Sequence, residues 1–339
     1  MKDIILKSIK LNNFRCHEEY ILDCNKKTTL ILGQNGCGKT SVLEAIYISL
    51  LGKSFRASDK DIIKRDADYY RIETIFSSGE KVVVVYNRSG KKEFLCKDKK
   101  TARLPKKNRY PIVLFLPEDL HIIATSPTKR RDYFDRIITQ LNERYSSALL
   151  RYNKALKQRN ELLKQDYVTP DNLFSWDVIL AKYGVEIQRG RKEISDLINQ
   201  SLNQTYQSIA KNLDNVVFRY DSYIGNISES EYLRLLNMDF ERDLLTGHTN
   251  FGVHKDDYRF IFNNVDADGS ASRGEVRSII LALKFIEADI IYSKTNKKPI
   301  VLLDDVFSEL DEMRQKRLVE NFKNHQVVLT SVGNVNINH

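Results

Sequence analysis

The chain has 339 residues, which is long enough to bury a full core and to form two lobes or domains. With 42% hydrophobic and 29% charged residues it has the composition of a globular protein, and no run approaches the roughly 18 to 20 apolar residues of a membrane-spanning helix. Its formal net charge of +9 indicates an anionic partner, such as a nucleic acid.

The hydrophobic pattern predicts an α/β protein that begins with strands. Apolar alternation and β-branched runs predict strands at residues 4–10, 28–32, 70–76, 81–86 and 112–116. From about residue 130 to residue 215, leucine and isoleucine recur three and four residues apart, which predicts helices, and a turn at 167–171 divides them into an antiparallel pair. The expected order ends with a strand at 258–263, a long helix at 272–292 and a strand–helix–strand unit.

Two features indicate a reducing cytoplasm. The N-terminal segment MKDIILKSIKLNNF alternates like a strand and lacks the apolar core and cleavage site of a signal peptide. The four cysteines include no C-x-x-C pair, so neither a disulfide scaffold nor a zinc site is expected. We therefore expect a cytoplasmic protein with no membrane partner.

The sequence GQNGCGKT at residues 33–40 fits the P-loop pattern G-x-x-x-x-G-K-[ST] in full. It follows an apolar run and precedes a helix-like stretch, which is the context that the motif requires. Glycines in such a loop let backbone N–H groups approach phosphates, and the helix N-terminus favours their negative charge. Lys39 is expected on the β- and γ-phosphates of ATP, and the hydroxyl of Thr40 on Mg²⁺.

A second half of the same site is expected near the other end of the chain. The segment PIVLLDDVFSELD (299–311) predicts a buried parallel strand that ends in two aspartates. Asp304 is expected to hold Mg²⁺ through water beside Thr40, and Asp305 to orient and deprotonate the attacking water. Turns after strands often carry Asp, so this signal is weak alone and strong together with the P-loop. The separation predicts one ATPase head interrupted by a long insertion.

The segment SRGE (272–275) precedes that strand at the start of a predicted helix. Serine at a helix start is also a common N-cap. Its position before Asp304 favours a second phosphate-binding helix N-terminus that cannot serve the P-loop of the same monomer. Two chains would then meet over each nucleotide.

Two basic runs favour nucleic acid as the anionic partner. Residues 91–109 carry nine Lys and Arg, and residues 129–159 carry nine more. A single basic run is more often a solubilising surface, but two in a P-loop protein with no other obvious substrate favour a nucleic acid bound through its phosphates. The candidate DNA-binding residues are Lys91, Lys92, Lys106, Lys107, Lys129, Arg130 and Arg131.

Six longer blocks cover most of the chain. They are LNNFRCHEEY (11–20), GQNGCGKTSVLEAIYISLLGKSFR (33–56), FLPEDLHIIATSPTKRRDYFD (115–135), GVHKDD (252–257), SRGEVRSIILALKFIEA (272–288) and LLDDVFSELD (302–311). Together they resemble the RecF family, which are ABC-type ATPases of DNA repair. The P-E-D-L block, the G-K-S-x-R block and the aspartate pair in place of Asp-Glu are specific to that family among ABC ATPases.

The resemblance implies an ABC-type P-loop ATPase head of two lobes with an inserted α-helical domain. The expected divisions are 1–134 and 250–339 for the two parts of the head and 135–249 for the insertion, which resembles the family only in length and helical character. The resemblance further implies ATP-dependent dimerisation on double-stranded or gapped DNA, slow hydrolysis, cooperation with RecR and RecO in placing RecA on DNA, and a part in SOS induction. Turnover would be a weak, DNA-stimulated ATPase activity at most.

The resemblance also assigns site residues. Those expected to contact ATP are Arg15, Gly33, Gln34, Asn35, Gly36, Cys37, Gly38, Lys39, Thr40, Ser41, Ser272, Gly274 and Glu275, the last three on the partner subunit's nucleotide. Asp305 and Lys39 are the expected catalytic residues, and Thr40 and Asp304 the Mg²⁺ site.

Three positions depart from the family pattern. Val253 stands where the G-x-H-x-D-D block usually has proline, and Cys37 fills a P-loop position usually held by a small residue, where its thiol is a candidate for alkylation. No switch histidine follows the last strand, because Thr330 and Ser331 offer only hydroxyls. Sensing of the γ-phosphate there is expected to be weak, as in a slow ATPase that acts as a timer.

Other functions fit less well. A head of the SMC or Rad50 type needs hundreds of residues of heptads, whereas this insertion of about 115 residues has no unbroken a/d pattern. A transporter ATPase keeps its P-loop and aspartate strand much closer together. A scaffold that binds nucleotide and DNA with negligible hydrolysis stays open, because Asp305 is shorter than the glutamate common elsewhere.

Overall fold

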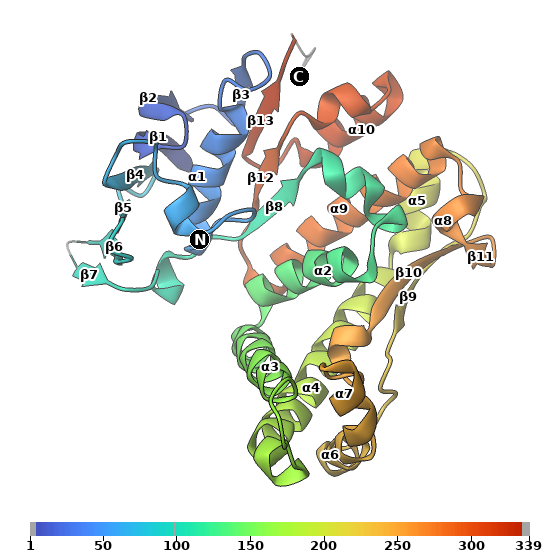
Figure 1. Cartoon of the computed structure of the whole chain (residues 1–339). Coiled ribbons are helices and arrows are strands. Elements are labelled where there is room, and N and C mark those ends of the chain that lie inside the picture. Colours follow the sequence, from blue (N-terminus) through green and yellow to red (C-terminus); the bar gives the residue numbers. More distant parts are fainter. Residues whose placement is uncertain (1–4, 98, 334–339) are drawn as a thin grey trace. The chain divides into compact units, whose positions relative to one another are not determined.

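The computed structural model describes residues 5–97 and 99–333, and the chain divides into two compact units at Leu120/His121 and at Ile286/Glu287 (Figure 1). The first unit contains the parts of the chain on either side of the second. Parallel and antiparallel sheets and many helices confirm the α/β class. Among the described residues, no helix is long and apolar enough to cross a membrane.

The first unit contains a four-stranded parallel sheet of order β3-β13-β12-β8. Its strands are β3 (Thr28–Leu32), β8 (Ile112–Phe115), β12 (Ile300–Leu303) and β13 (Val327–Ser331). Every residue of β8 and β12 is buried, as in a parallel sheet that is covered on both faces. β13 therefore separates the strand before the P-loop from the strand before the aspartate pair.

Helix α1 (Lys39–Leu51) is buried on all sides because it lies between two sheets. A helix that is apolar all round must be covered all round. On one side α1 packs on the parallel sheet, and on the other on an antiparallel sheet of order β2-β1-β4-β5-β6-β7. The antiparallel strands are β1 (Leu6–Phe14), β2 (His17–Asp23), β4 (Tyr69–Phe76), β5 (Lys81–Asn87), β6 (Lys92–Cys96) and β7 (Lys99–Thr101).

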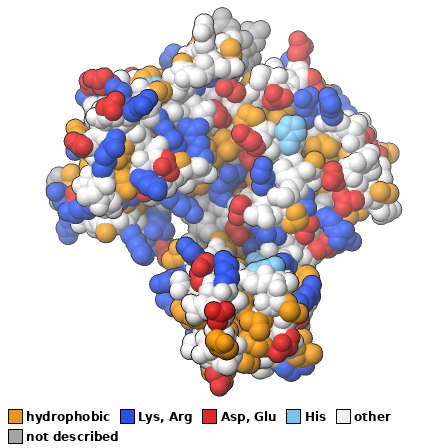
Figure 2. Space-filling view, in the orientation of Figure 1, with side chains coloured by type: hydrophobic (Ala, Val, Ile, Leu, Met, Phe, Trp, Pro, Cys, Tyr) orange, Lys and Arg blue, Asp and Glu red, His pale blue; other side chains and the backbone are white. Residues whose placement is uncertain are grey.

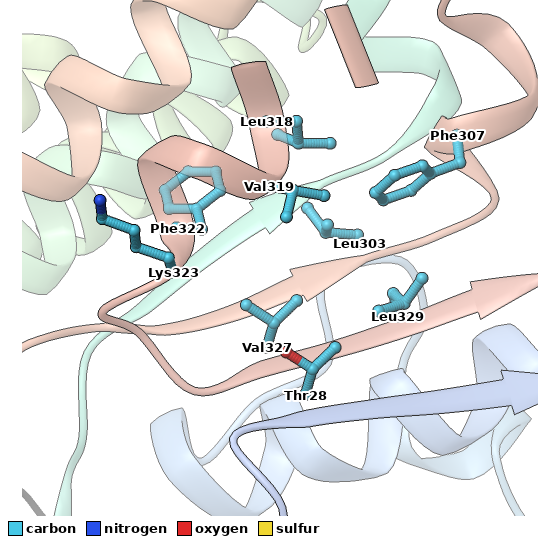
Figure 3. Close-up of a pocket in the computed structure, with 9 residues that line it drawn as sticks. All are labelled: Thr28, Leu303, Phe307, Leu318, Val319, Phe322, Lys323, Val327 and Leu329. Carbon is cyan, nitrogen blue, oxygen red and sulfur yellow. The ribbon is translucent and has the colours of Figure 1, made fainter. Parts of the chain in front are cut away.

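Helix α10 (Glu312–Phe322) covers the opposite face of the parallel sheet and leaves a small apolar cavity there (Figure 3). The cavity measures about 20 Å³. Val327 of β13 and Leu318 of α10 line it, and so does Phe307 of the short helix η5 (Val306–Glu309) that follows Asp305. The sheet is thus tightly packed against α1 and loosely packed under the segment after the aspartate pair.

The second unit combines helices with a three-stranded antiparallel sheet of order β11-β10-β9. The helices are α2 (Pro127–Leu141), α3 (Glu143–Leu162), α4 (Pro170–Asn199), α5 (Leu202–Ala210), α6 (Glu229–Met238), α7 (Phe240–Thr246), α8 (Ala267–Ser270) and α9 (Arg273–Thr295), whose last residues belong to the first unit. The strands are β9 (Val216–Asp221), β10 (Asp257–Phe262) and β11 (Val265–Asp266). Short 3₁₀ helices lie at Asp59–Asp61, Lys106–Asn108, Pro117–Ala124 and Val253–Lys255.

The predicted helix pair is confirmed, and its turn has the predicted chemistry. α3 and α4 meet as an antiparallel pair, with Pro170 in the first turn of α4. Thr169 and Asn172 form a reciprocal capping box at its N-terminus. Two buried arginines also connect the pair to other helices, Arg159 of α3 to α7 through Asp243 and Arg191 of α4 to α2 through Asp135.

Five strands were missed from the sequence: β2, β6, β7, β9 and the two-residue β11. β2 and β7 are sheet edges with no fully buried residue, so charged side chains hide their alternation. β6 and β7 lie inside the first basic run, which therefore belongs largely to a hairpin. β9 follows the predicted helical region directly, in a segment for which no element was predicted.

Candidate nucleotide site

The P-loop joins the end of β3 to the start of α1. Gly36 and Gly38 have φ values of 84° and 96°, a left-handed conformation that only glycine adopts without strain. Lys39 is 5% exposed, and its Nζ donates to the carbonyl oxygens of Gly33 at 2.8 Å and Gln34 at 3.2 Å. The loop thus wraps around the ammonium group that a P-loop presents to phosphate.

Three side chains from separate elements meet beside this loop. The hydroxyl of Thr40, at the start of α1, lies 2.9 and 2.8 Å from the two carboxylate oxygens of Asp304. Asp304 directly follows β12, and Thr330 of β13 donates its hydroxyl to Asp304 Oδ1 at 2.8 Å. The carboxyl ends of parallel strands lie at one edge of a sheet, so the fold brings together residues 264 positions apart.

Burial and a neighbouring carboxylate leave the Asp304 anion poorly stabilised, and the positive charge of Arg56 offsets this only in small part. Burial raises the pKa of Asp304 and the neighbouring charge of Asp305 also raises it, while hydrogen bonds from Thr40 and Thr330 oppose the rise. A raised carboxyl pKa means that the anionic form is poorly stabilised. A cation beside Asp304 would relieve that deficit.

Asp305 has a left-handed backbone, with φ 48° and ψ 19°, which is uncommon for a residue with a side chain. Its N–H donates to Thr330 Oγ1 at 2.8 Å, and its carbonyl accepts from the Ser308 hydroxyl at 2.6 Å. Asp305 Oδ2 lies 3.5 Å from Lys39 Nζ, and the buried Oδ1 has no hydrogen-bond partner among the described residues. A carboxylate oxygen that can still accept a hydrogen bond therefore lies beside the P-loop lysine.

The donor set fits Mg²⁺, the ion that the family resemblance implies. Thr40 offers a hydroxyl oxygen and Asp304 a carboxylate, and Mg²⁺ prefers hard oxygen ligands. Mg²⁺ usually takes only one or two protein carboxylates and fills its remaining positions with water and phosphate. The predicted metal residues are thus in contact with each other, and their chemistry suits the ion.

Glu44 is fully buried in α1 and binds two arginines. Arg15 donates Nε and Nη2 to its carboxylate at 2.9 Å each, Arg56 donates Nε and Nη2 at 3.0 and 2.9 Å, and Ser54 donates its hydroxyl at 2.6 Å. Burial acts to raise the pKa of Glu44, but these donors outweigh it and the pKa lies below its ordinary value. The guanidinium of Arg15 is held by this network and by the carbonyl of Asp61. Its predicted contact with ATP stays a prediction.

The turn between β1 and β2 lies against the P-loop. The exposed Cys16 has its Sγ 3.9 Å from the carbonyl oxygen of Cys37, and His17 Nε2 lies 3.1 Å from the carbonyl oxygen of Gly38. Cys37 is exposed, and its Sγ would lie 2.5 Å from a Cβ placed on Gly33. A side chain at the first P-loop position would therefore force the Cys37 thiol to move. All four cysteines are free thiols.

Ser272 and Glu275 belong to the second unit and form a capping box at the start of α9. The Ser272 N–H donates to the Glu275 carboxylate at 2.6 Å, and the Glu275 N–H lies 3.3 Å from the Ser272 hydroxyl. Ser272 is exposed and Gly274 partly exposed. Both the ordinary capping role and an outward-facing helix N-terminus are therefore present, and contact with a partner's nucleotide stays a prediction.

The seven candidate DNA-binding residues fall into two groups. Lys91, Lys106, Lys107 and Lys129 are exposed, although Lys91 pairs with Glu93 at 2.9 Å. Lys92, Arg130 and Arg131 instead bind the protein itself: Lys92 contacts Asp59, Arg130 contacts Asp257, and Arg131 contacts the carbonyl of Asp256. Figure 2 shows Lys and Arg side chains over the part of the first unit that contains β5 to β7, interspersed with acidic ones.

Sequence reasoning missed two functional groups. Glu44 gave a signal, because a carboxylate in an otherwise apolar helix needs partners, and Ser54 and Arg56 of the G-K-S-x-R block supply them. Thr330 was seen only as a weak substitute for a histidine, and its two contacts with the aspartate pair could not be read from a strand sequence.

The fold and the site define an ABC-type P-loop ATPase head. The sequence profile of the AAA domain family matches residues 8–325. The DNA replication and repair protein RecF of Clostridioides difficile is 34% identical over 96% of this chain and 91% of its own, and that of Clostridium acetobutylicum is 33% identical over 97% and 93%. The chain belongs to the RecF family.

Solved structures agree. The recombination mediator protein RecF of the RecFOR pathway, in its structure with ATPrS, superposes with a TM-score of 0.89 at 29% identity, covering 98% of this chain and 93% of that one. An Smc head bound to the C-terminal winged-helix domain of ScpA has a TM-score of 0.52 at 15% identity, over 97% and 90% of the two chains, and this likeness shows the fold alone.

Proposed function

We propose that this protein is an ATP-controlled DNA clamp of recombinational repair in the bacterial cytoplasm. It dimerises on double-stranded or gapped DNA with ATP, hydrolyses the ATP slowly, and helps RecO and RecR load RecA, which links it to SOS induction. The observation that carries the proposal is the meeting of Thr40, Asp304 and Asp305 beside Lys39, because a site built from both ends of the chain suits ATP with Mg²⁺. Related RecF proteins have been solved with ATP and ATPrS.

The residues of the site divide the chemistry between them. The backbone N–H groups of the loop and Lys39 hold the phosphates. Thr40 and Asp304 hold Mg²⁺, which supplies charge neutralisation to the transferring phosphate. Asp305 orients the attacking water and accepts its proton, and the unpartnered Oδ1 is the atom suited to this step.

Dimerisation rests on the outward-facing start of α9. In a dimer, Ser272 and the helix N-terminus behind it would bind the phosphates held by the partner's P-loop. ATP then stabilises the dimer because its phosphates satisfy groups of two chains at once. Loss of the γ-phosphate removes part of that bridge, and the dimer opens.

For DNA contact, the exposed lysines of the candidate set support the proposal best. Lys106 and Lys107 lie in a short helix next to the basic β6–β7 hairpin. Reversing both charges should weaken duplex affinity by about 10-fold at moderate salt and flatten its salt dependence, because each phosphate contact releases counterions. Lys26 and Lys27 are also exposed and consecutive in the sequence, so reversing both of their charges provides a control with the same charge change. This control should alter duplex affinity little. Equal effects of the two double variants would refute this placement of the DNA face.

The second candidate function is a nucleotide-binding DNA scaffold with negligible hydrolysis, which the short side chain of Asp305 favours. Asp305→Asn separates the two functions. For a clamp with hydrolytic release, the variant should lose turnover and lengthen the lifetime of the ATP dimer. For a scaffold, it should change neither.

The decisive test of the clamp is sedimentation of the protein with Mg·ATP, with and without a gapped duplex. A monomer that becomes a DNA-bound dimer only with ATP is expected. Ser272→Arg should bind ATP as a monomer and fail to dimerise, whereas Ser228→Arg, which alters a similar serine cap on α6, should dimerise normally. A monomer that ATP leaves unchanged, or a dimer formed by Ser272→Arg, contradicts the shared-site clamp.

A further inference from the structure

The hydroxyl of Thr330 makes contact with both acidic residues of the site. It donates to Asp304 Oδ1 at 2.8 Å, and it accepts from the backbone N–H of Asp305, also at 2.8 Å. Thr330 is 0% exposed. Since a hydroxyl has only one proton, giving it to Asp304 leaves the oxygen as an acceptor for Asp305. One buried atom therefore links the carboxylate on the metal side to the residue on the water side.

The two contacts have different roles, and the one with Asp305 supports its backbone conformation. Asp305 has a left-handed backbone, which costs of order 1 kcal/mol or more for a residue with a side chain and needs support from its surroundings. The Thr330 hydroxyl holds the N–H side of that residue, and the Ser308 hydroxyl holds its carbonyl. Without Thr330, the N–H of Asp305 would have to find another acceptor.

Asp304 depends on Thr330 for a different reason. Among the described residues, the side-chain donors to its carboxylate are the hydroxyls of Thr40 and Thr330. Thr40 is the residue whose hydroxyl a P-loop presents to Mg²⁺. When Thr40 serves the metal, Thr330 is the donor that still fixes the orientation of Asp304.

We propose that Thr330 is a positioning residue that couples the two aspartates, so that the orientation of Asp304 toward Mg²⁺ also fixes the orientation of Asp305 toward water. The hydroxyl on the last strand thus acts on the aspartate pair, not on the γ-phosphate in place of a switch histidine. This inference rests on the proposed ATP site for its effect on turnover. Its effect on Mg²⁺ dependence can be measured without turnover.

The test uses Thr330→Val, which removes the hydroxyl and keeps the shape, and Thr330→Ser, which keeps the hydroxyl and removes a methyl group. A matched control exists on the neighbouring strand β3, where the buried hydroxyl of Thr29 lies near the Cys24 thiol and makes no hydrogen bond to either aspartate. Thr29→Val makes the same chemical change at a buried hydroxyl that contacts neither aspartate. Thermal unfolding of each variant checks that it folds.

The first readout is binding of a fluorescent ATP analogue, titrated with Mg²⁺ and repeated with a chelator. For Thr330→Val we expect unchanged binding with chelator and an Mg²⁺ concentration for half-maximal effect that rises by about 10-fold, the scale of one hydrogen bond to a charged group. Turnover of ATP should fall by about 10-fold or more, with little change in KM. Thr330→Ser and Thr29→Val should stay within about 3-fold of the parent in both readouts.

The outcomes separate this inference from the proposed function. If the parent protein binds the analogue with Mg²⁺ dependence but shows no turnover, hydrolysis fails as a function, and the Mg²⁺ readout still decides the role of Thr330. If Thr330→Val keeps the parent's Mg²⁺ response, or Thr330→Ser loses it as fully as the valine variant, the inference is overturned. Should Thr330→Val not fold, Thr330→Ala replaces it with the same expected losses and the same overturning result.

Discussion

The buried arginines of the second unit and the charged side chains at the P-loop of the first unit are paired to different degrees. In the second unit, Arg159 and Arg191 are each enclosed and each bind two aspartates at 2.6 to 2.9 Å. In the first unit, Lys39 and Asp305 lie 3.5 Å apart, and one carboxylate oxygen of Asp305 has no partner among the described residues. The buried charges of the second unit are saturated by the protein, whereas those at the P-loop are not.

This difference separates structural from functional charge. A buried ion pair stabilises a fold only weakly relative to an apolar core, but removing one partner leaves a charge that is costly to bury. The second unit uses such pairs to fix which helices meet. At the P-loop the charged groups are only partly paired within the protein, so phosphate, Mg²⁺ and water can pair with them.

The largest expected effect comes from breaking a saturated pair. Arg159 donates to Asp177 of α4, to Asp243 of α7 and to the hydroxyl of Thr249. Arg159→Met would leave both aspartates buried and unpaired, and we expect the free energy of unfolding to fall by about 3 to 5 kcal/mol. Urea denaturation would measure this. Arg234→Met, which removes an exposed arginine paired with Glu231, should change stability little, and a similar small loss for Arg159→Met would contradict the comparison.

The next effect concerns pH and also lies in the second unit. His254 Nε2 contacts the carbonyl of Thr249, so it carries the proton, and Nδ1 accepts from the hydroxyl of Tyr152. Burial lowers the pKa of His254 to about 4, with the charges of Lys255 and Arg131 acting in the same direction. An unfolded histidine has a pKa near 6.5.

The sign of the pH effect follows from these two pKa values. Below pH 6.5 the unfolded chain binds a proton at His254, whereas the folded protein does not bind one there until the pH nears 4. The contribution of this neutral histidine to the free energy of unfolding is therefore complete above pH 6.5 and is lost as the pH falls toward 4. The loss from this group is about 3 kcal/mol at most. Denaturation curves between pH 7 and 4.5 should show a steeper loss for the parent than for His254→Gln, while His248→Gln, at an exposed histidine, should follow the parent. Parallel curves for all three proteins would refute the buried neutral histidine.

At the P-loop, the comparison predicts losses in binding and not in folding. Lys39→Ala should weaken ATP binding by about 100-fold, since the ammonium group is placed for phosphate. Asp305→Asn breaks the same 3.5 Å pair from its other side and should leave ATP binding within about 3-fold of the parent. Calorimetric titration measures both, and thermal unfolding should show little change. Equal losses of affinity in the two variants would mean that the pair is structural.

The sequence predicted those parts of this site that lie in contiguous motifs. The P-loop residues and the metal pair Thr40 and Asp304 were predicted, and the structure places the latter two in contact. The left-handed backbone of Asp305 and the double contact of Thr330 could not be predicted, because both depend on β13 lying between β3 and β12. The alternation within a strand predicts which side chains share a face of the sheet, but it does not predict which strands lie on either side.

The second unit was harder to predict for a related reason. The helix spacing gave the α3–α4 pair, but the partners of Arg159 lie 18 and 84 residues away, and no local pattern connects them. In the same way, charge counting could not separate exposed lysines such as Lys107 from Arg130, which is buried against Asp257. Composition gives the number of charges, and only the fold shows which of them are already paired.

The smallest expected effect concerns packing. It tests whether the first unit, whose P-loop charges are incompletely paired, is also incompletely packed on one face of its parallel sheet. Val327 and Val328 are neighbours on β13 whose side chains point to opposite faces of the sheet. Val327 lines the cavity under α10 (Figure 3). Val328 is 0% exposed in the core against α1. Val327→Ile should add about 0.5 kcal/mol of stability by filling space, less than the roughly 0.8 kcal/mol of a buried methylene because the fit is imperfect.

Val328→Ile adds the same methylene on the packed face and should instead cost about 1 kcal/mol through strain. Urea denaturation of the two variants side by side measures the difference. If both substitutions destabilise equally, the cavity closes in solution and the sheet is packed alike on its two faces. The expected result is that Val327→Ile stabilises and Val328→Ile destabilises the protein. In that case η5, which follows Asp305 directly and contains Phe307, packs on a part of the core with unfilled volume.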